Sequence, residues 1–263
     1  MTKRNRAITL VFVLFLIGVY LSFWAFSAAW FKKEIDYLYA NAKEDGVQFL
    51  GPKPTLTNFP LVPEVHYTGG LKFGNATLLF PKVMVHGFPI PSMTLHISFP
   101  EGVQLAGIVD PIIWSLSSLD TRLAVPYHLP KTFTVEDISK WQSQGGQIYI
   151  REYELHKGSL YTYGKGHFAF DENLQPAFFL DSNVQGYEAF IEEQKQLGLI
   201  DPFAGAVGMT ILNGLATKDD ASGEREVYLS VSVKNRILTV GPLQVLELPQ
   251  IVWDTRSSPA PRQ

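Results

Sequence analysis

One apolar run near the start of the sequence restricts how the chain can fold. The 25 residues from Ala7 to Phe31 carry no charge, and 21 of them are hydrophobic. A helix of this length rises roughly 37 Å, enough to cross a hydrocarbon core of about 30 Å. Small residues at Ser27-Ala28-Ala29 would suit a cleaved signal peptide, but the apolar core of such a peptide spans only about 7–15 residues. We therefore predict an uncleaved transmembrane anchor over residues 7–31.

Charges on either side of this run favour one orientation. Lys3, Arg4 and Arg6 precede it, against Lys32 and Lys33 after it, so the positive-inside rule favours residues 1–6 in the cytoplasm. The rest of the chain would then lie outside the cytoplasmic membrane. We expect three aromatic residues to anchor the exit side of the helix in the membrane interface: Trp24, Trp30 and Phe31.

Composition excludes several classes of protein. With 18 Phe, 11 Tyr and 5 Trp the chain has far more to bury than a disordered protein. The absence of cysteine excludes disulfide scaffolds, thiolate zinc sites, iron–sulfur clusters and cysteine nucleophiles. Residues 32–263 hold 19 Lys and Arg against 25 Asp and Glu, and this excess of acid disfavours a nucleic-acid partner.

Beyond residue 46 the pattern is typical of strands. Four Phe-Pro pairs fall between residues 59 and 100, where proline suits strand ends, edges and bulges. We predict several short strands between residues 107 and 145, and a hairpin in which Val227–Val233 and Ile237–Val240 flank a turn at Lys234-Asn235. The other predicted strands are Glu64–Phe73, Thr77–His86, Ser92–Phe99, Gln147–His156, Leu160–Asp171 and Ala177–Gln185.

Two amphipathic helices are predicted near residues 187–217. The first begins at Tyr187 and ends at Gly198, and the second opens with Asp201 as N-cap and Pro202 at its first position. The apolar stripe of the second helix comprises Phe203, Val207, Ile211, Leu212 and Leu215. The predicted fold is mainly β (α+β): one transmembrane helix, then an antiparallel β-rich domain that forms a curved sheet or a sandwich, with the two helices inserted. The predicted divisions are 1–6 (basic tip), 7–31 (anchor), 32–46 (helical extension ended by Gly46), 47–253 (β-rich domain) and 254–263 (disordered tail).

Short motifs in the second half of the chain resemble one known family. They are Gly164 to Asp171, Leu197-Gly198-Leu199-Ile200, Leu238 to Pro242 and Leu248-Pro249, with Leu56 to Pro60 and His86 to Pro89 as earlier counterparts. The chain thereby resembles, over about residues 55–253, the bacterial family called "domain of unknown function 2125". The resemblance implies a membrane-anchored envelope protein with no assigned chemistry. It places the anchor in the bacterial inner membrane and the bulk of the chain in the periplasm.

Motifs for catalysis or metal binding are not evident. The six histidines show no ligand spacing, and no G-x-S-x-G sequence occurs. Gly164-Lys165-Gly166-His167 lacks the remainder of a phosphate loop and indicates a β-bulge or a close approach of backbones. We expect a solvated turn at Asp219-Asp220. The prediction is a protein that is not an enzyme, with no catalytic residue, metal or cofactor.

Aromatic side chains crowd the central strands. They would fill a two-sided β core, or line an apolar trough that takes up a lipid. We therefore hypothesise a non-enzymatic protein that binds a lipid or other apolar ligand. The alternative is a scaffold subunit of an envelope complex, and an enzyme would require a cleft where histidines and acidic residues converge. The candidate trough residues are Tyr149, Tyr153, Tyr161, Tyr163, Phe168, Phe170 and Phe178.

Overall fold

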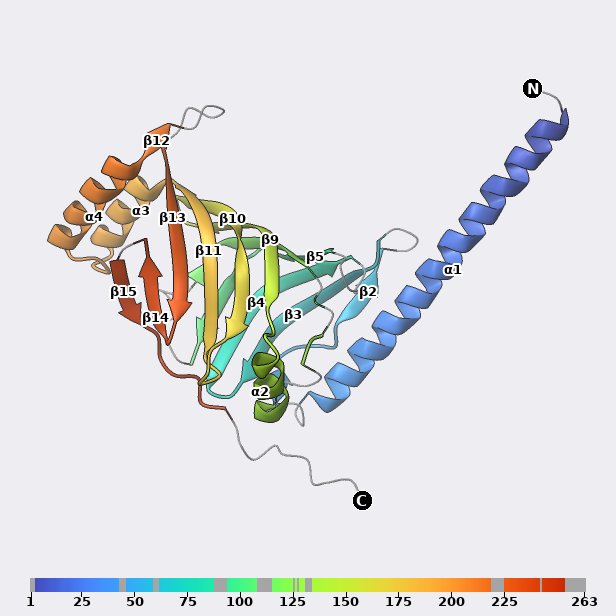
Figure 1. Ribbon diagram of the computed structural model, residues 1–263, viewed down its shortest axis with the longest axis horizontal. Coiled ribbons are helices and arrows are strands. Elements are labelled where there is room, and N and C mark those ends of the chain that lie inside the picture. Colours follow the sequence, from blue (N-terminus) through green and yellow to red (C-terminus); the bar gives the residue numbers. More distant parts are fainter. Residues whose placement is uncertain are drawn as a thin grey trace, which may run out of the picture.

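A long helix followed by one large, open antiparallel sheet makes up the computed structural model (Figure 1). It describes residues 3–42, 46–58, 62–87, 94–107, 115–124, 126, 128–130, 134–218, 225–241 and 243–253. The predicted fold class is confirmed, and its two alternatives are resolved, because the described strands form a single curved sheet. The predicted tail 254–263, Asp219-Asp220, Phe59-Pro60 and Phe88-Pro89 lie outside the described residues.

Helix α1 (Lys3–Asn41) joins the predicted anchor and its extension into one element. Its 39 residues correspond to roughly 58 Å, and its described part is long and apolar enough to cross a membrane. Among the described residues, the C-terminal end of α1 contacts the sheet. Tyr39 packs against Phe49 at 5.3 Å between ring centroids and donates a hydrogen bond to the Gly51 carbonyl, while Asp36 pairs with Lys53 at 2.5 Å. The helix then runs away from the sheet into open space (Figure 1).

All strand pairs are antiparallel, and the sheet does not close on itself. The main path runs β1-β3-β4-β5-β8-β9-β10-β11-β13-β14-β15, and β2, β6, β7 and β12 pair to its sides. In Figure 1 the N-terminal strands pass behind β10 and β11, so the sheet curves around one of its faces. The strands are β1 (Val47–Phe49), β2 (Thr55–Thr57), β3 (Glu64–Phe73), β4 (Ala76–His86), β5 (Thr94–Phe99), β6 (Val103–Ala106), β7 (Ser115–Leu116), β8 (Ser118–Ala124), β9 (Ile148–Lys157), β10 (Leu160–Phe170), β11 (Pro176–Gln185), β12 (Thr217–Lys218), β13 (Arg225–Lys234), β14 (Ile237–Val240) and β15 (Leu243–Glu247).

Two of the Phe-Pro pairs occupy the positions that proline chemistry favours. Pro81 lies in the irregular part of the β3–β4 register, between the pairs Tyr67–Val83 and Gly69–Phe80, and Pro100 directly follows β5. Proline has no N–H to donate to a neighbouring strand, so it is tolerated at a bulge and at a strand end. This expectation is confirmed at both sites.

The prediction of several short strands between residues 107 and 145 is confirmed only in part. Strands β7 and β8 form there, but helix α2 (Val135–Ser143) follows them. Thr134 caps the helix by accepting a hydrogen bond from the Asp137 N–H, and Ile138 and Trp141 are buried beneath it. A short helix with two buried anchors gives little periodicity, which is why the sequence pattern did not reveal it.

Helices α3 (Tyr187–Gln196) and α4 (Pro202–Leu215) form as the sequence predicts. The Asp201 carboxylate accepts hydrogen bonds from the N–H groups of Phe203 and Ala204, at 2.9 and 3.0 Å, so it is the N-cap of α4. After α3, Gly198 adopts a φ of +71°, the left-handed conformation that ends helices.

The final hairpin forms with its turn one residue later than predicted. Asn235 and Arg236, with φ of 51° and 67°, occupy the two central positions between β13 and β14. Two successive residues at positive φ are the mark of a type I′ turn, whose twist matches that of the flanking strands.

Two separate hydrophobic clusters hold the sheet. One, around Tyr67, Phe80 and Val83, belongs to the N-terminal strands. The other joins Tyr187 of α3 to Val227 and Leu229 of β13, with side chains of α4 packed against them. The clusters therefore lie in the two halves of the sheet, and the central strands connect them.

The segment that follows β15, residues 248–253, connects two distant turns, and we call it the C-terminal strap. At the β3–β4 turn, Asn75 donates to the Gln250 carbonyl and accepts from the Val252 N–H. At the β10–β11 turn, the Gln175 side chain donates to the Ile251 carbonyl at 3.1 Å and accepts from the Ile251 N–H at 2.7 Å. Because these turns belong to the two halves of the sheet, the strap fixes them relative to each other.

Candidate functional site

The central strands have two faces of different chemistry. Residues paired directly across antiparallel strands project to the same face, so the register assigns every side chain. We call the face that carries Tyr153 the inner face, because both hydrophobic clusters lie on it, and the opposite one the outer face. Four cross-strand rows define the centre of the inner face: Ile148-Phe168-Phe178-Val233, Leu95-Leu123-Ile150-Gly166-Leu180-Val231, Ile97-Thr121-Tyr153-Gly164-Ser182-Leu229 and Phe99-Leu119-Leu155-Thr162-Val184-Val227.

No side chain in these four rows is charged, and most of the apolar ones are only partly buried. In a closed core the same residues would be excluded from water. Those that retain intermediate exposure are Leu95, Ile97, Phe99, Leu119, Leu123, Ile148, Ile150, Leu155, Phe168, Phe178, Leu180, Val184 and Val231. The inner face is therefore an apolar surface that the described residues cover incompletely.

The seven aromatic residues predicted to line a trough do not share one face. Tyr153, Phe168, Phe170 and Phe178 lie on the inner face. Tyr149, Tyr161 and Tyr163 lie on the outer face, so they cannot contact a ligand that is bound inside. The proposed ligand contact stays a prediction for the four inner residues.

A bulge in β9 separates Tyr149 from Tyr153. The register with β8 and β10 shifts between Ile150 and Glu152, so one extra residue lies between the two tyrosines. An extra residue inverts the alternation of faces, which leaves Tyr149 59% exposed and Tyr153 5% exposed.

Tyr153 crosses the inner face beside a glycine. Its hydroxyl donates to the buried Ser182 Oγ at 2.5 Å and lies 3.2 Å from Thr162 Oγ1, which brings β9, β10 and β11 together. Gly164 occupies the position between Tyr153 and Ser182 in this row. A Cβ atom on Gly164 would lie 1.8 Å from the Asp181 carbonyl oxygen, and one on Gly166 would lie 2.0 Å from that of Phe179. The predicted bulge or close backbone approach at this motif is confirmed, since both features occur.

The end of the inner face near the β10–β11 turn is covered. The Trp141 ring of α2 and the Trp253 ring of the strap pack edge-on against Phe170, at 6.2 and 5.8 Å between centroids. Trp253 also donates to the Leu174 carbonyl, and Trp141 to that of His128. At the other end, α3 and α4 pack over Val227 and Leu229. Helices thus cover the inner face at both ends of the central strands.

The aromatic residues predicted as interfacial anchors occupy different environments. Trp30 is 41% exposed, Trp24 is partly buried, and Phe31 is 8% exposed and in edge contact with Trp30. Phe31 therefore faces protein rather than solvent, while Trp30 remains accessible to a membrane interface.

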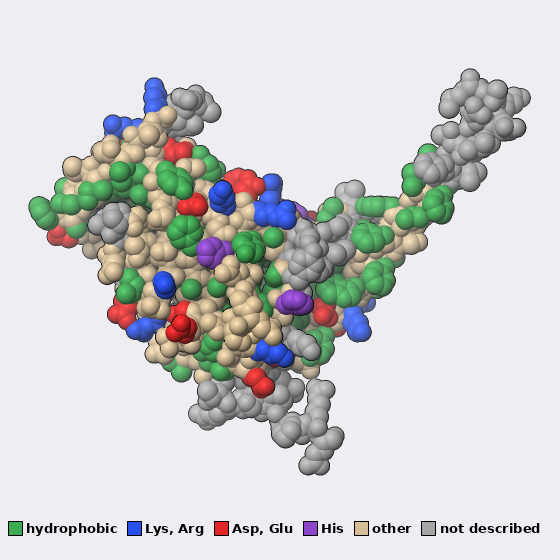
Figure 2. Space-filling view, viewed as in Figure 1, with side chains coloured by type: hydrophobic (Ala, Val, Ile, Leu, Met, Phe, Trp, Pro, Cys, Tyr) green, Lys and Arg blue, Asp and Glu red, His purple; other side chains and the backbone are tan. Residues whose placement is uncertain are grey.

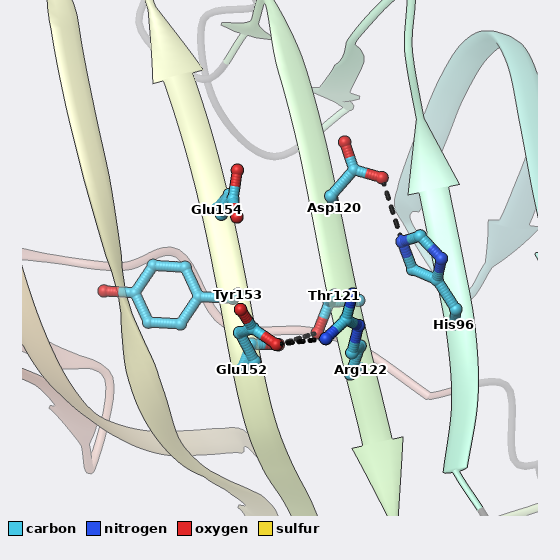
Figure 3. A pocket seen from close by; sticks show the side chains of 7 residues that line it. All are labelled: His96, Asp120, Thr121, Arg122, Glu152, Tyr153 and Glu154. Atoms are coloured by element: carbon cyan, nitrogen blue, oxygen red, sulfur yellow. Dashed lines mark hydrogen bonds and ion pairs between the residues drawn. The ribbon is translucent and has the colours of Figure 1, made fainter.

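Polar side chains gather on the outer face of β5, β8 and β9. His96, Asp120, Arg122, Glu152 and Glu154 line a hollow of about 230 Å³ (Figure 3). Arg122 pairs with Glu152 at 2.6 Å, and His96 Nε2 lies 3.1 Å from Asp120 Oδ1. No local sequence pattern marks this group, because only the strand register brings its members together.

Strand β4 extends this group with a second histidine. His96 Nδ1 and His86 Nε2 share a hydrogen bond, and the two rings meet edge to face at 4.2 Å between centroids. Burial lowers the pKa of His86 below its usual value, and the neighbouring His96 lowers it further, while Glu64 and Asp120 oppose the change. His86 therefore stays neutral to lower pH than a solvated histidine does.

The chemistry open to this outer group is limited. Both ring nitrogens of His96 are engaged, one by His86 and one by Asp120. Among the described residues there is no group of three or more histidines and acids that could hold a metal ion. The arrangement is that of a cross-strand hydrogen-bond network.

The fold and the inner face define a class: a β-rich domain with an incompletely covered apolar sheet face, attached to a helix long enough to span a membrane. Residues 111–249, more than half of the chain, match the family described as "Uncharacterized protein conserved in bacteria (DUF2125)", and the chain belongs to this family. The match covers β7–β15 and α2–α4, which contain the second half of the sheet. No curated protein and no solved structure matches the chain.

Proposed function

We propose that this chain is a non-enzymatic protein of the bacterial envelope that binds a lipid or other apolar ligand along its inner face. Helix α1 would anchor it in the inner membrane, with the N-terminus in the cytoplasm and the sheet in the periplasm. The observation that carries the proposal is the set of four uncharged, partly exposed rows between two helix-covered ends. Each square ångström of such surface that a ligand covers contributes about 25 cal/mol.

The curvature of the sheet supports an elongated ligand. The strap holds the β3–β4 and β10–β11 turns relative to each other, so contacts within the protein fix the curvature of the sheet that Figure 1 shows. Preformed apolar surfaces with few polar groups are typical of sites for small apolar molecules. Within the four rows, the hydroxyls of Thr121, Thr162 and Ser182 are the polar side chains besides Tyr153.

Adjacent residues of β11 allow a matched test. Leu180 projects to the inner face and Phe179 to the outer face. The full-length protein and its Leu180→Glu and Phe179→Glu variants would be extracted from bacterial membranes and examined by native mass spectrometry for bound phospholipid. We expect Leu180→Glu to lose the phospholipid and Phe179→Glu to retain it, with circular dichroism confirming that both variants fold.

A second measurement uses the unaltered protein. In membranes that contain a phospholipid with a photoreactive acyl chain, α1 should form adducts in any case. The proposal requires further adducts on inner-face residues of β9, β10 and β11. Adducts confined to α1, together with no retained phospholipid, would refute it.

A scaffold function is the second candidate, and one observation favours it. The outer face exposes three aromatic side chains, Tyr149, Phe179 and Tyr228, in a region that also carries His167. Exposed aromatic residues are common where proteins bind each other. Loss of a membrane partner from Phe179→Glu but not from Leu180→Glu, without any bound lipid, would support this candidate instead.

A further inference from the structure

Helix α4 exposes an apolar stripe that the packing of the domain does not use. From Pro202 to Leu215 the helix has no charged residue. Side chains spaced by four residues lie along one side of a helix. The stripe consists of Phe203, Val207, Ile211 and Leu215, which are 78%, 43%, 36% and 49% exposed.

The opposite side of α4 already forms the contact with the sheet. Met209 and Leu212 pack against the cluster of Tyr187, Val227 and Leu229. Gly205 is buried against the Lys195 stem of α3. The helix is therefore apolar on two sides, of which one is satisfied by the protein. Two further apolar side chains, Leu197 and Leu199, are exposed in the loop that precedes α4.

The position of this stripe can be compared with that of α1. In Figure 1 helix α1 leaves the lower part of the sheet and runs to the upper right, while the α3–α4 pair lies at the upper left, at the opposite end of the sheet. Figure 2 shows hydrophobic side chains along α4, with basic side chains above them near β12, where Lys218 is exposed. An exposed apolar stripe is the feature by which an interfacial helix enters a membrane surface, and Lys218 adds one positive charge near it.

We propose that α4 inserts this stripe into the interface of the bilayer that α1 crosses. The inference rests on the membrane anchoring in the proposed function. The stripe offers no charge and no hydrogen-bonding side chain by which a protein partner could be selected, whereas a bilayer requires only apolar area. The anchor also keeps the bilayer at high effective concentration, so a weak contact suffices. Because α4 covers one end of the inner face, its insertion would bring that end to the lipid.

The absence of cysteine from the chain makes a site-specific test direct. Single variants Val207→Cys on the stripe and Ala189→Cys on α3 would each carry a nitroxide label. The full-length protein would be reconstituted into vesicles of phosphatidylethanolamine and phosphatidylglycerol. Collision rates with oxygen, which partitions into lipid, and with a water-soluble nickel chelate would be measured by electron paramagnetic resonance.

We expect the ratio of oxygen to nickel collisions to be several-fold higher at position 207 than at position 189. The stripe variant Phe203→Asp/Ile211→Asp should bring the label at 207 to the ratio seen at 189. An equal ratio in the unaltered background would overturn the inference, as would a label at 207 shielded from both reagents, which would indicate a protein partner or a second copy. Extraction of the vesicles at high pH separates the two proposals. Release of the protein would refute anchoring by α1. Retention of the protein with the label at 207 exposed to water would refute only the insertion of α4.

Discussion

At the scale of single residues, neighbouring strands determine the environment of two positions, Gly164 and His86. Gly164 lies between the Tyr153 and Ser182 positions of one row, and its backbone closely approaches the Asp181 carbonyl of β11. His86 owes its environment to partners from two other strands, Glu64 on β3 and His96 on β5. Both positions lead to predictions.

We expect Gly164→Ala to destabilise the protein by about 2 kcal/mol or more, because the added Cβ meets backbone rather than a flexible side chain. The control is Gly214→Ala in α4, where nothing lies within 4 Å of an added Cβ. That change should be neutral or stabilise by up to about 1 kcal/mol, since alanine favours helix. Urea unfolding of the full-length protein in detergent micelles measures both. Equal stability of the two variants would contradict the close approach of Gly164 to the Asp181 carbonyl.

The pKa of His86 predicts how stability depends on pH. Since its pKa is lower in the folded protein than in the unfolded chain, the unfolded chain binds more protons as the pH falls through the unfolded value, which is near 6.5. The groups that face it are Glu64, His96, Asp120 and Arg122. The contribution of His86 to the free energy of unfolding is therefore fully present above that pH and is lost as the pH falls below it.

We expect His86→Gln to show a shallower loss of unfolding free energy than the unaltered protein between about pH 7.5 and about pH 5. Urea midpoints recorded by tryptophan fluorescence across this range give the two slopes. His128→Gln, at an exposed histidine far along the chain from this network, is the control and should leave the slope unchanged. A steeper slope in His86→Gln would show that the histidine is stabilised in its charged form.

At the scale of elements, the C-terminal strap is held by side chains that imitate strand pairing. The Gln175 amide donates to and accepts from the backbone of Ile251, as a neighbouring strand would, and Asn75 does the same for Gln250 and Val252. Four hydrogen bonds from these two side chains thereby hold the backbone of the strap, although the strap does not belong to the sheet.

We expect Gln175→Ala to release the strap while the sheet remains folded. Both of its bonds to Ile251 are buried, so their loss leaves backbone groups without partners at a cost of about 1–3 kcal/mol. Hydrogen exchange of the full-length protein should then be faster at residues 250–253 and unchanged in β10 and β11. Glu172→Ala, an exposed change in the same turn, should have no such effect. Protection at Ile251 that survives Gln175→Ala would show that other contacts hold the strap.

At the scale of the whole molecule, alternation and turn chemistry were enough to predict most elements. The strands β3 to β5, β9 to β11, β13 and β14, the N-cap of α4 and the single long helix follow from such local signals. Even the split of the candidate site was partly readable, because Tyr161 and Tyr163 differ in parity from Phe168 and Phe170 and so must face the other way.

What the sequence could not reveal depends on contacts between distant segments. The bulge that separates Tyr149 from Tyr153 has no local signature, and His86, His96 and Asp120 meet only through the register of β4, β5 and β8. The predicted stripe of α4 proved to be mainly the exposed side, since a helix that is apolar all round does not indicate which side faces the sheet.

The strap also bears on how the protein folds. Asn75 and Gln250 are 175 residues apart in the chain, and contacts of such long sequence separation form late and slowly. At a synthesis rate of about 5–20 residues per second, roughly 10–35 s pass between the appearance of these two residues. During that interval the two turns are not yet tied together, and the uncharged rows of the central strands are open to aggregation.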